Sequence, residues 1–273
     1  MKHKCEVIKA NLLEAKRQGL VSDAVYKGQV EELGRLVRDE LLDFSQVIEF
    51  FRDVFDQPYL SREFMMYLSV IKNYYSFEAF AVEDIFDQNN LISYLKNRYS
   101  TEALERFIDI CGGEAEYEAD FNSVCESVYS GRSVYAVVPL SNTTDGLHVS
   151  LYKLLLKYDL KIVAATSIIM ADGVTESKFV LATKSDTVLN NATNALISFT
   201  SEVDSFLPKL LEITTSVGIK VKLINTLPLE YTDDRYEIII DFDLSSFDVD
   251  VFRAFIKFAL PDCNIIGMYY TVK

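Results

Sequence analysis

The sequence has no tryptophan, two histidines and four cysteines, and none of the cysteines forms a C-x-x-C pair. Zinc sites and disulfide frameworks need paired cysteines or Cys/His clusters, so we expect neither. Glycine-rich nucleotide loops, H-E-x-x-H and G-x-S-x-G are also missing from the sequence. We therefore predict no metal and no cofactor, and cysteines that are reduced and mostly buried.

Basic residues are scarce as well, because 27 lysines and arginines stand against 41 acidic residues and leave a net charge of −14. Binding to nucleic acid or to an anionic membrane needs a basic surface, so we expect neither partner. No apolar run approaches the roughly 20 residues that span a bilayer, and the N-terminus lacks the apolar core of a secretion signal. We predict a cytoplasmic protein.

The sequence does have enough apolar material for several cores, with 273 residues of which 49% are hydrophobic. This length fits two or three domains. Residues 1–111 show helical spacing and almost no strand pattern, so we predict an N-terminal all-α domain. Its last two helices are expected at 90–98 and 101–111, with Gly112 and Gly113 ending the second.

The pattern changes at Gly112, where strands and helices begin to alternate. A strand, a helix and another strand imply a right-handed crossover within one sheet, so we predict a single βαβ-type lobe over residues 112–187. The expected elements are a helix at 121–129, a strand at 133–140, a turn at 141–146, a helix at 147–158, and strands at 160–169 and 178–184.

A polar linker at 185–194 precedes the third region, residues 195–273. The expected elements are strands at 195–202, 219–227, 235–243 and 263–272, and helices at 205–217 and 248–259. This order predicts a βαββαβ, ferredoxin-like module with both helices on one face of the sheet, and an α+β or α/β fold class for the chain. The bare face and the open edges of such a sheet favour pairing with a second copy, so we predict a homodimer.

The turn Ser141–Gly146 (SNTTDG) lies between a predicted strand and a predicted helix. Free N–H groups and the helix dipole favour an anion at such a place, where Asn142, Thr143 and Thr144 can hold a carboxylate. Alternatively, Thr144 or Asp145 merely caps the helix. The sequence leaves both interpretations open.

Three other polar residues flank this turn. Arg132 and Lys178 come near the ends of adjacent predicted strands, where they can neutralise a dianionic ligand or serve only as solvated strand-end charges. His148 lies just inside the predicted helix. Since it has no partner serine, cysteine or metal ligand at a recognisable spacing, we assign it a surface or capping role.

Residues 117–163 carry a longer motif. Its matching positions are Gly131, Tyr135, Val137, Val138, Pro139, Asn142, Thr143, Thr144, Asp145 and Gly146. The segment resembles the prephenate dehydratase family, which has G-x-x-x-Y-x-V-V-P-x-E-N-S/T-T/S-E/D-G before a helix ending L-L-L-x-x-D-L-K-I-V. Ser141 departs from this pattern, because the family usually has glutamate there.

The resemblance also implies where catalysis would take place. The Thr-Arg-Phe motif of the family maps to Ser177-Lys178-Phe179, so Ser177 is the candidate catalytic hydroxyl, while Lys178 cannot reproduce the bidentate fork of arginine. The family inserts a second lobe before this motif, with the active site between the lobes. Here only Ala164–Glu176 separate the L-K-I-V strand from the motif, which is too short for a second lobe and leaves half of a cleft.

Residues 195–273 resemble the ACT domain that follows the dehydratase in the same family. The phenylalanine-sensing Gly-Ala-Leu of that domain maps to Ser205–Leu207, and its Glu-Ser-Arg-Pro maps to Asn225–Pro228. Only Leu207 and Pro228 are retained, so the resemblance implies a small ligand or dimerisation rather than phenylalanine feedback.

The segments 20–37 and 47–65 are faintly similar to a chorismate mutase domain, although Tyr26 and Lys27 replace an Arg-Glu pair. Two classes of function follow from these resemblances. One is a binding or regulatory protein of aromatic amino-acid metabolism, whose ligand is a small carboxylate such as prephenate or an aromatic amino acid. The other is an enzyme on prephenate or chorismate with a rebuilt site. The deleted lobe favours the first.

Overall fold

The computed structural model describes residues 2–18, 28–29, 32, 90–184, 192–201, 207–217, 219–229, 235–249, 252–253, 256 and 263–272. The helices predicted between residues 19 and 89, and with them the chorismate mutase resemblance, lie outside this part of the chain, apart from the helical residues 28, 29 and 32. No helix within the described ranges is long and apolar enough to cross a membrane.

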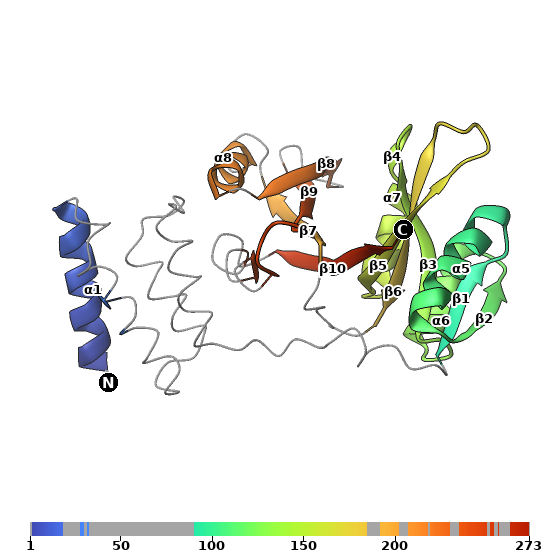
Figure 1. The fold of residues 1–273 in the computed structure, drawn as a ribbon, viewed down its shortest axis with the longest axis horizontal. Helices are drawn as coiled ribbons and strands as arrows, with labels where there is room; N and C mark the ends of the chain where they lie inside the picture. Colours follow the sequence, from blue (N-terminus) through green and yellow to red (C-terminus); the bar gives the residue numbers. More distant parts are fainter. Residues whose placement is uncertain are drawn as a thin grey trace.

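The described strands join in one ten-stranded mixed sheet of order β2-β1-β3-β6-β5-β10-β7-β9-β8, in which β4 pairs with β3 (Figure 1). The strands are β1 (Leu91–Leu95), β2 (Glu114–Glu118), β3 (Tyr135–Asn142), β4 (Gly146–Leu147), β5 (Lys161–Ile169), β6 (Glu176–Thr183), β7 (Asn194–Ser201), β8 (Lys220–Pro228), β9 (Tyr236–Asp243) and β10 (Asn264–Val272). The helices are α1 (Lys2–Arg17), α5 (Arg98–Cys111), α6 (Phe121–Tyr129), α7 (Val149–Lys157) and α8 (Leu207–Val217). We call residues 90–184 the lobe and the described residues from 192 to 272 the C-terminal module.

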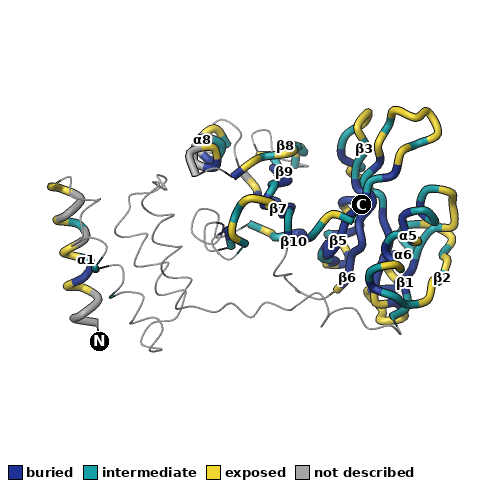
Figure 2. The backbone as a smooth tube through the Cα atoms, viewed as in Figure 1, coloured by how far each residue is buried: buried dark blue, intermediate teal, exposed yellow. Residues whose placement is uncertain are grey.

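The centre of the lobe confirms the predicted crossover. β3 and β5 both run antiparallel to β6, which lies between them, so they run parallel to each other and α7 connects them. The predicted helix at 121–129 coincides with α6, where Asp120 provides the N-cap. Figure 2 shows that β3, β5 and β6 are the buried strands, whereas the hairpin ends beyond them are exposed.

The helix predicted at 90–98 is wrong, because Leu91–Leu95 form strand β1. A short apolar run fits one face of a helix as well as a buried strand, so non-local contacts decide between them. Here β1 lies between β2 and β3 and runs parallel to both. The sheet of the lobe therefore begins before residue 112.

The next predicted helix, 101–111, is confirmed as the larger part of α5. Asn97 caps it, since its Oδ1 atom accepts hydrogen bonds from Tyr99 N at 3.1 Å and from Ser100 N at 2.9 Å. Gly112 ends it with a φ of 63°, a backbone conformation that favours glycine. Both β1 and α5 pack in the lobe, on the N-terminal side of the boundary predicted at residue 112.

The C-terminal module has the strand order β10-β7-β9-β8, with every neighbouring pair antiparallel. Each of its four strands lies within one residue of the predicted bounds, and α8 confirms the helix predicted at 205–217. Of the helix predicted at 248–259, the described residues 249, 252, 253 and 256 are helical. Phe252 packs against Phe242 of β9 with ring centroids 5.2 Å apart, so this segment covers one face of the sheet.

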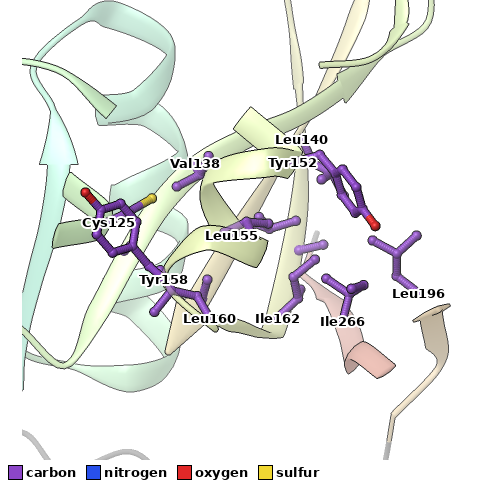
Figure 3. Close-up of a cluster of buried hydrophobic side chains, with 14 of the residues drawn as sticks. Cys125, Val138, Leu140, Tyr152, Leu155, Tyr158, Leu160, Ile162, Leu196 and Ile266 are labelled. Atoms are coloured by element: carbon purple, nitrogen blue, oxygen red, sulfur yellow. The ribbon is translucent and has the colours of Figure 1, made fainter. Parts of the chain in front are cut away.

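The other face of the module's sheet packs against the lobe. Leu196, Ile239 and Ile266 of the module share one buried core with Tyr152 and Leu155 of α7 (Figure 3). The sheet face that we expected to be bare is thus covered within the chain. This contact removes one of the two physical reasons for the predicted homodimer, whereas the open-edge argument is unaffected.

Candidate functional site

The SNTTDG turn closes a hairpin instead of leading into a helix. Asn142 ends β3 and pairs with Gly146 of β4. α7 begins only at Val149, with His148 in the N-cap position and no side-chain cap hydrogen bond. The interpretation in which Thr144 or Asp145 caps this helix is therefore wrong.

The amide of Asn142 is committed to its own turn. Its Oδ1 atom accepts hydrogen bonds from Thr144 N at 2.9 Å and from Asp145 N at 2.5 Å. Its Nδ2 atom donates to Asp145 Oδ2 at 2.9 Å. Asn142 thus shapes the hairpin in the way that Asx turns do.

The β5–β6 connection has a similar side-chain anchor. Asp172 Oδ1 accepts hydrogen bonds from Val174 N at 3.0 Å and Thr175 N at 2.8 Å, and its Oδ2 accepts one from Thr175 Oγ1 at 2.5 Å. The Thr175 hydroxyl and these backbone N–H groups hold the pKa of Asp172 below its usual value.

The two hairpin ends, residues 142–146 and 170–176, contact each other, and we call them the paired tips. Thr143 N donates to Glu176 O at 3.0 Å, and Glu176 N donates back to Thr143 Oγ1 at 3.0 Å. The hydroxyls of Thr144 and Thr175 lie 3.0 Å apart. The polar groups of the SNTTDG turn, which were predicted to bind an anion, therefore form hydrogen bonds within the paired tips.

Ser177 lies directly opposite Asn142 in the β3–β6 ladder and is 3% exposed. Its hydroxyl donates to Ser141 O at 3.4 Å. Among the described residues, no histidine or carboxylate hydrogen-bonds to this hydroxyl. A serine nucleophile is usually activated by such a partner, and the described residues place none at Ser177.

Lys178, the next residue, points away from the paired tips. Its Nζ atom donates to Asp241 Oδ2 of β9 at 2.7 Å and to the Tyr269 hydroxyl of β10 at 2.5 Å. The Tyr269 hydroxyl in turn donates to Asp241 Oδ1 at 2.8 Å. We call these three residues the Lys178 triad, in which an ammonium and a phenol surround one carboxylate.

The triad is buried at the junction of the lobe and the module. The side chains of Lys178 and Asp241 are 22% and 7% exposed, and Tyr269 is fully buried. Burial, together with the charge and the hydrogen bond of Asp241, raises the pKa of Tyr269 well above its usual value. The phenol therefore remains a hydrogen-bond donor throughout the neutral pH range.

A sharp bend in the sheet brings these residues together. Three strands lie between β6 and β9 in the sheet order, which would place them roughly 19 Å apart on a flat sheet. The ladders of β10 with β5 and with β7 both shift register beside Gly267. A Cβ atom on Gly267 would lie 2.4 Å from Ile162 O, so the close approach of β10 to β5 requires glycine.

A second buried contact crosses the same junction. The Tyr152 hydroxyl of α7 donates to Glu237 Oε1 of β9 at 2.7 Å. Burial is the main cause that raises the pKa of Tyr152, and the hydrogen bond to Glu237 adds to it. Together with the Lys178 triad, this bond fixes β9 against two elements of the lobe.

Arg132 does not reach either of these places. It forms an ion pair with Glu118 at 3.4 Å, and it precedes β3, whereas Asn142 ends β3. An eight-residue strand is roughly 26 Å long, so the two residues lie at opposite ends of the lobe. The structure thus brings Asn142, Thr143, Thr144 and Ser177 together, turns Lys178 toward the module and leaves Arg132 apart.

Sequence reasoning missed Asp241, Tyr269, Tyr152 and Glu237. One signal was available, because Asp241 interrupts the apolar run of β9, YEIIIDFD, and a charge in a buried strand needs a partner. Within the described ranges, no cluster of three histidine, cysteine, aspartate or glutamate side chains is placed to hold a metal ion.

Comparisons with known proteins agree with this architecture. Residues 95–195 match the family model for prephenate dehydratase. No curated protein matches the chain. The match supports a relationship of this segment, which contains most of the lobe, to the prephenate dehydratase family.

Three solved structures share the fold. Prephenate dehydratase from Streptococcus mutans is 16% identical with a TM-score of 0.58, and the match covers 68% of this chain and 100% of that one. GqqA, described as a novel type of quorum quenching acylase, is 18% identical with a TM-score of 0.55 and coverages of 66% and 94%. Prephenate dehydratase from Arthrobacter aurescens, in complex with L-Phe, is 13% identical with a TM-score of 0.50 and coverages of 66% and 90%.

Proposed function

We propose that this chain binds a small aromatic carboxylate as a regulatory or binding protein of aromatic amino-acid metabolism, and that it does not dehydrate prephenate. The observation that carries the proposal is the Lys178 triad. Lys178 Nζ and the Tyr269 hydroxyl already surround a carboxylate, that of Asp241. Donors that hold one carboxylate in this way can also hold a different carboxylate in its place.

Loss of dehydratase chemistry has two physical supports. Ser177, at the position of the catalytic threonine in the family resemblance, is buried, and no base in the described part of the chain hydrogen-bonds to its hydroxyl. β5 also turns directly into β6 through residues 170–175, so no second lobe is inserted there to close a cleft and exclude water.

The choice of ligand rests on the family relationship of residues 95–195 and on one neighbour's ligand, L-Phe, which is bound by the protein from Arthrobacter aurescens. Within the proposed site, Lys178 supplies the positive charge. Asn142, Thr143 and Thr144 remain candidates for a second polar contact if the paired tips open. We no longer include Arg132, because it lies at the far end of β3.

Two measurements on the full chain test this proposal. Calorimetric titration with phenylpyruvate, prephenate and phenylalanine should show binding of at least one of them, and Lys178→Met should abolish it. Ser177→Ala should bind as the wild type does. Phenylpyruvate absorbance during incubation with prephenate should stay at background.

The alternative is an active enzyme on prephenate or chorismate. Phenylpyruvate formation that disappears in Ser177→Ala would establish the dehydratase, and enzymatic loss of chorismate would establish the mutase. Either result would replace our proposal.

We also propose a homodimer through the C-terminal module, which resembles an ACT domain. β8 ends the strand order, and in the described part of the chain no strand pairs with its outer edge. Such an edge favours pairing with another strand. Sedimentation of the full chain at tens of micromolar should show a dimer, and a monomer would contradict this part of the proposal.

A further inference from the structure

We infer that Asp241 is an internal competitor of the ligand, so that an external carboxylate occupies the Lys178–Tyr269 pair only when Asp241 leaves Lys178 and its link between the C-terminal module and the lobe is broken. This inference rests on the proposed function, since it names how the same site is regulated. It concerns three residues on two parts of the fold: Lys178 belongs to the lobe, whereas Asp241 and Tyr269 belong to the module.

Competition follows from the geometry of the triad. Both oxygens of Asp241 are taken, Oδ2 by Lys178 Nζ at 2.7 Å and Oδ1 by the Tyr269 hydroxyl at 2.8 Å. Asp241 is also 7% exposed, so a second carboxylate cannot enter the place between Lys178 and Tyr269 while Asp241 occupies it. Two carboxylates beside one ammonium would also repel each other.

Coupling to module docking follows from where the residues lie. The Lys178–Asp241 ion pair joins β6 to β9, and displacing Asp241 removes this link between the lobe and the module. Because linkage is reciprocal, a change that weakens the Lys178–Asp241 link itself must strengthen ligand binding, and the ligand must weaken this link in turn.

The remaining contacts of the junction do not involve this carboxylate. Tyr152 binds Glu237 at 2.7 Å, and Thr166 Oγ1 of β5 donates to Val272 O of β10 at 3.2 Å. The bond between Tyr152 and Glu237 can hold the module near the lobe after Asp241 is displaced. It also provides a matched control, because Glu237→Gln weakens the same junction and leaves the Lys178 triad intact.

The first experiment titrates phenylpyruvate into four full-length proteins by calorimetry. Asp241→Asn keeps the size of the side chain and removes its charge, so it should bind at least 10-fold more tightly than the wild type. Adding Lys178→Met to Asp241→Asn should abolish the gain. Glu237→Gln should bind within about 2-fold of the wild type if competition by Asp241, rather than general loosening, controls access.

The second experiment uses the wild type alone and does not depend on the folding of any variant. Saturating phenylpyruvate should speed amide hydrogen exchange in β10, at Thr271 and Val272, where this strand pairs with β5. If the amides of Thr271 and Val272 exchange at the same rate with and without bound phenylpyruvate, the coupling is overturned.

The outcomes separate the inference from the proposed function. Equal affinity of the wild type and Asp241→Asn would overturn the competition and leave the carboxylate-binding function standing. An equal gain in Glu237→Gln and Asp241→Asn would show that loosening alone admits the ligand, and would also overturn the competition. Absence of phenylpyruvate, prephenate and phenylalanine binding in every protein would overturn both.

Discussion

The paired tips and the Lys178 triad are two polar clusters that meet on β6, where the tips end at Glu176 and the triad begins at Lys178. The two clusters are built in opposite ways. In the tips, side chains such as the half-buried Asn142 and the exposed Asp172 bind backbone groups two or three positions away. In the triad, Lys178 meets partners that are 63 and 91 residues distant, and all three side chains are largely buried. Local bonds of the first kind shape a hairpin, whereas bonds of the second kind join parts of the fold.

This contrast changes where a ligand site is expected. The turn carried the motif that drew attention in the sequence, yet its donors and acceptors are used within the paired tips. The triad has no local motif, but it places an ammonium and a phenol around a carboxylate. We therefore expect a ligand at the junction rather than in the paired tips.

The largest expected effect concerns the bend that creates the triad. In Gly267→Ala the added Cβ would lie 2.4 Å from Ile162 O and 2.8 Å from Ile162 N, and backbone atoms cannot move aside cheaply. We expect a loss of about 3 kcal/mol in the free energy of unfolding, measured by urea denaturation. Gly131→Ala is the control, because its φ of 75° strains alanine but no atom lies within 4 Å, and about 1 kcal/mol should be lost. Equal losses would show that β10 does not depend on this close approach.

The next effect concerns the triad itself. Lys178→Met leaves Asp241 buried without its cation, and we expect a loss of about 2–3 kcal/mol, less than for a fully buried pair because Lys178 is 22% exposed. Adding Asp241→Asn removes the stranded charge, so the double variant should be more stable than the sum of the two single losses predicts. Strict additivity in urea denaturation would mean that the two residues do not interact and would remove the contrast with the tips.

Sequence patterns were sufficient wherever the information was local. The helix at 121–129 was predicted to the residue, since its signals are local, and the structure adds a capping aspartate, Asp120, directly before it. β1 was mistaken for a helix because LISYL fits the helical period as well as the strand period. Its pairing with β2 and β3 decides in favour of a strand. β2 was missed, since its sequence, EAEYE, is that of an acidic edge strand without a buried apolar face.

The candidate site divides along the same line. Asn142, Thr143 and Thr144 were correctly placed in one turn, because a turn is a local structure. Arg132 was wrongly predicted to lie near Asn142. It precedes β3 whereas Asn142 ends β3, and the sequence pattern does not show which strand ends meet in the sheet. The partners of Lys178 could not be predicted, because they depend on how β10 bends between β5 and β7.

A smaller effect is expected at the second buried contact of the junction. Tyr152→Phe removes the hydrogen bond to Glu237 and should cost about 1–2 kcal/mol. Burial and this bond raise the pKa of Tyr152 above its ordinary value of 10.0. The stability that follows from a raised pKa is fully present below pH 10 and is lost as the pH rises above it, because the unfolded chain releases the proton first. Urea denaturation at several pH values should therefore show a less steep alkaline decline in Tyr152→Phe; an unchanged slope would mean that Tyr152 ionises freely in the native protein.

The smallest effect should come from the tips, and it has the opposite pH dependence. The Thr175 hydroxyl and the N–H groups of Val174 and Thr175 lower the pKa of Asp172, so the charged form is favoured in the folded state. Stability from a lowered pKa is fully present above the unfolded value of 3.8 and is lost as the pH falls from there through the lower pKa of the folded state. Asp172→Asn should thus be slightly less stable than the wild type at pH 7, and this difference should shrink as the pH falls below 3.8. Since Asp172 is fully exposed, the effect should be much smaller than that of Lys178→Met. A larger loss in Asp172→Asn than in Lys178→Met would reverse the comparison and place the stabilising polar contacts in the paired tips.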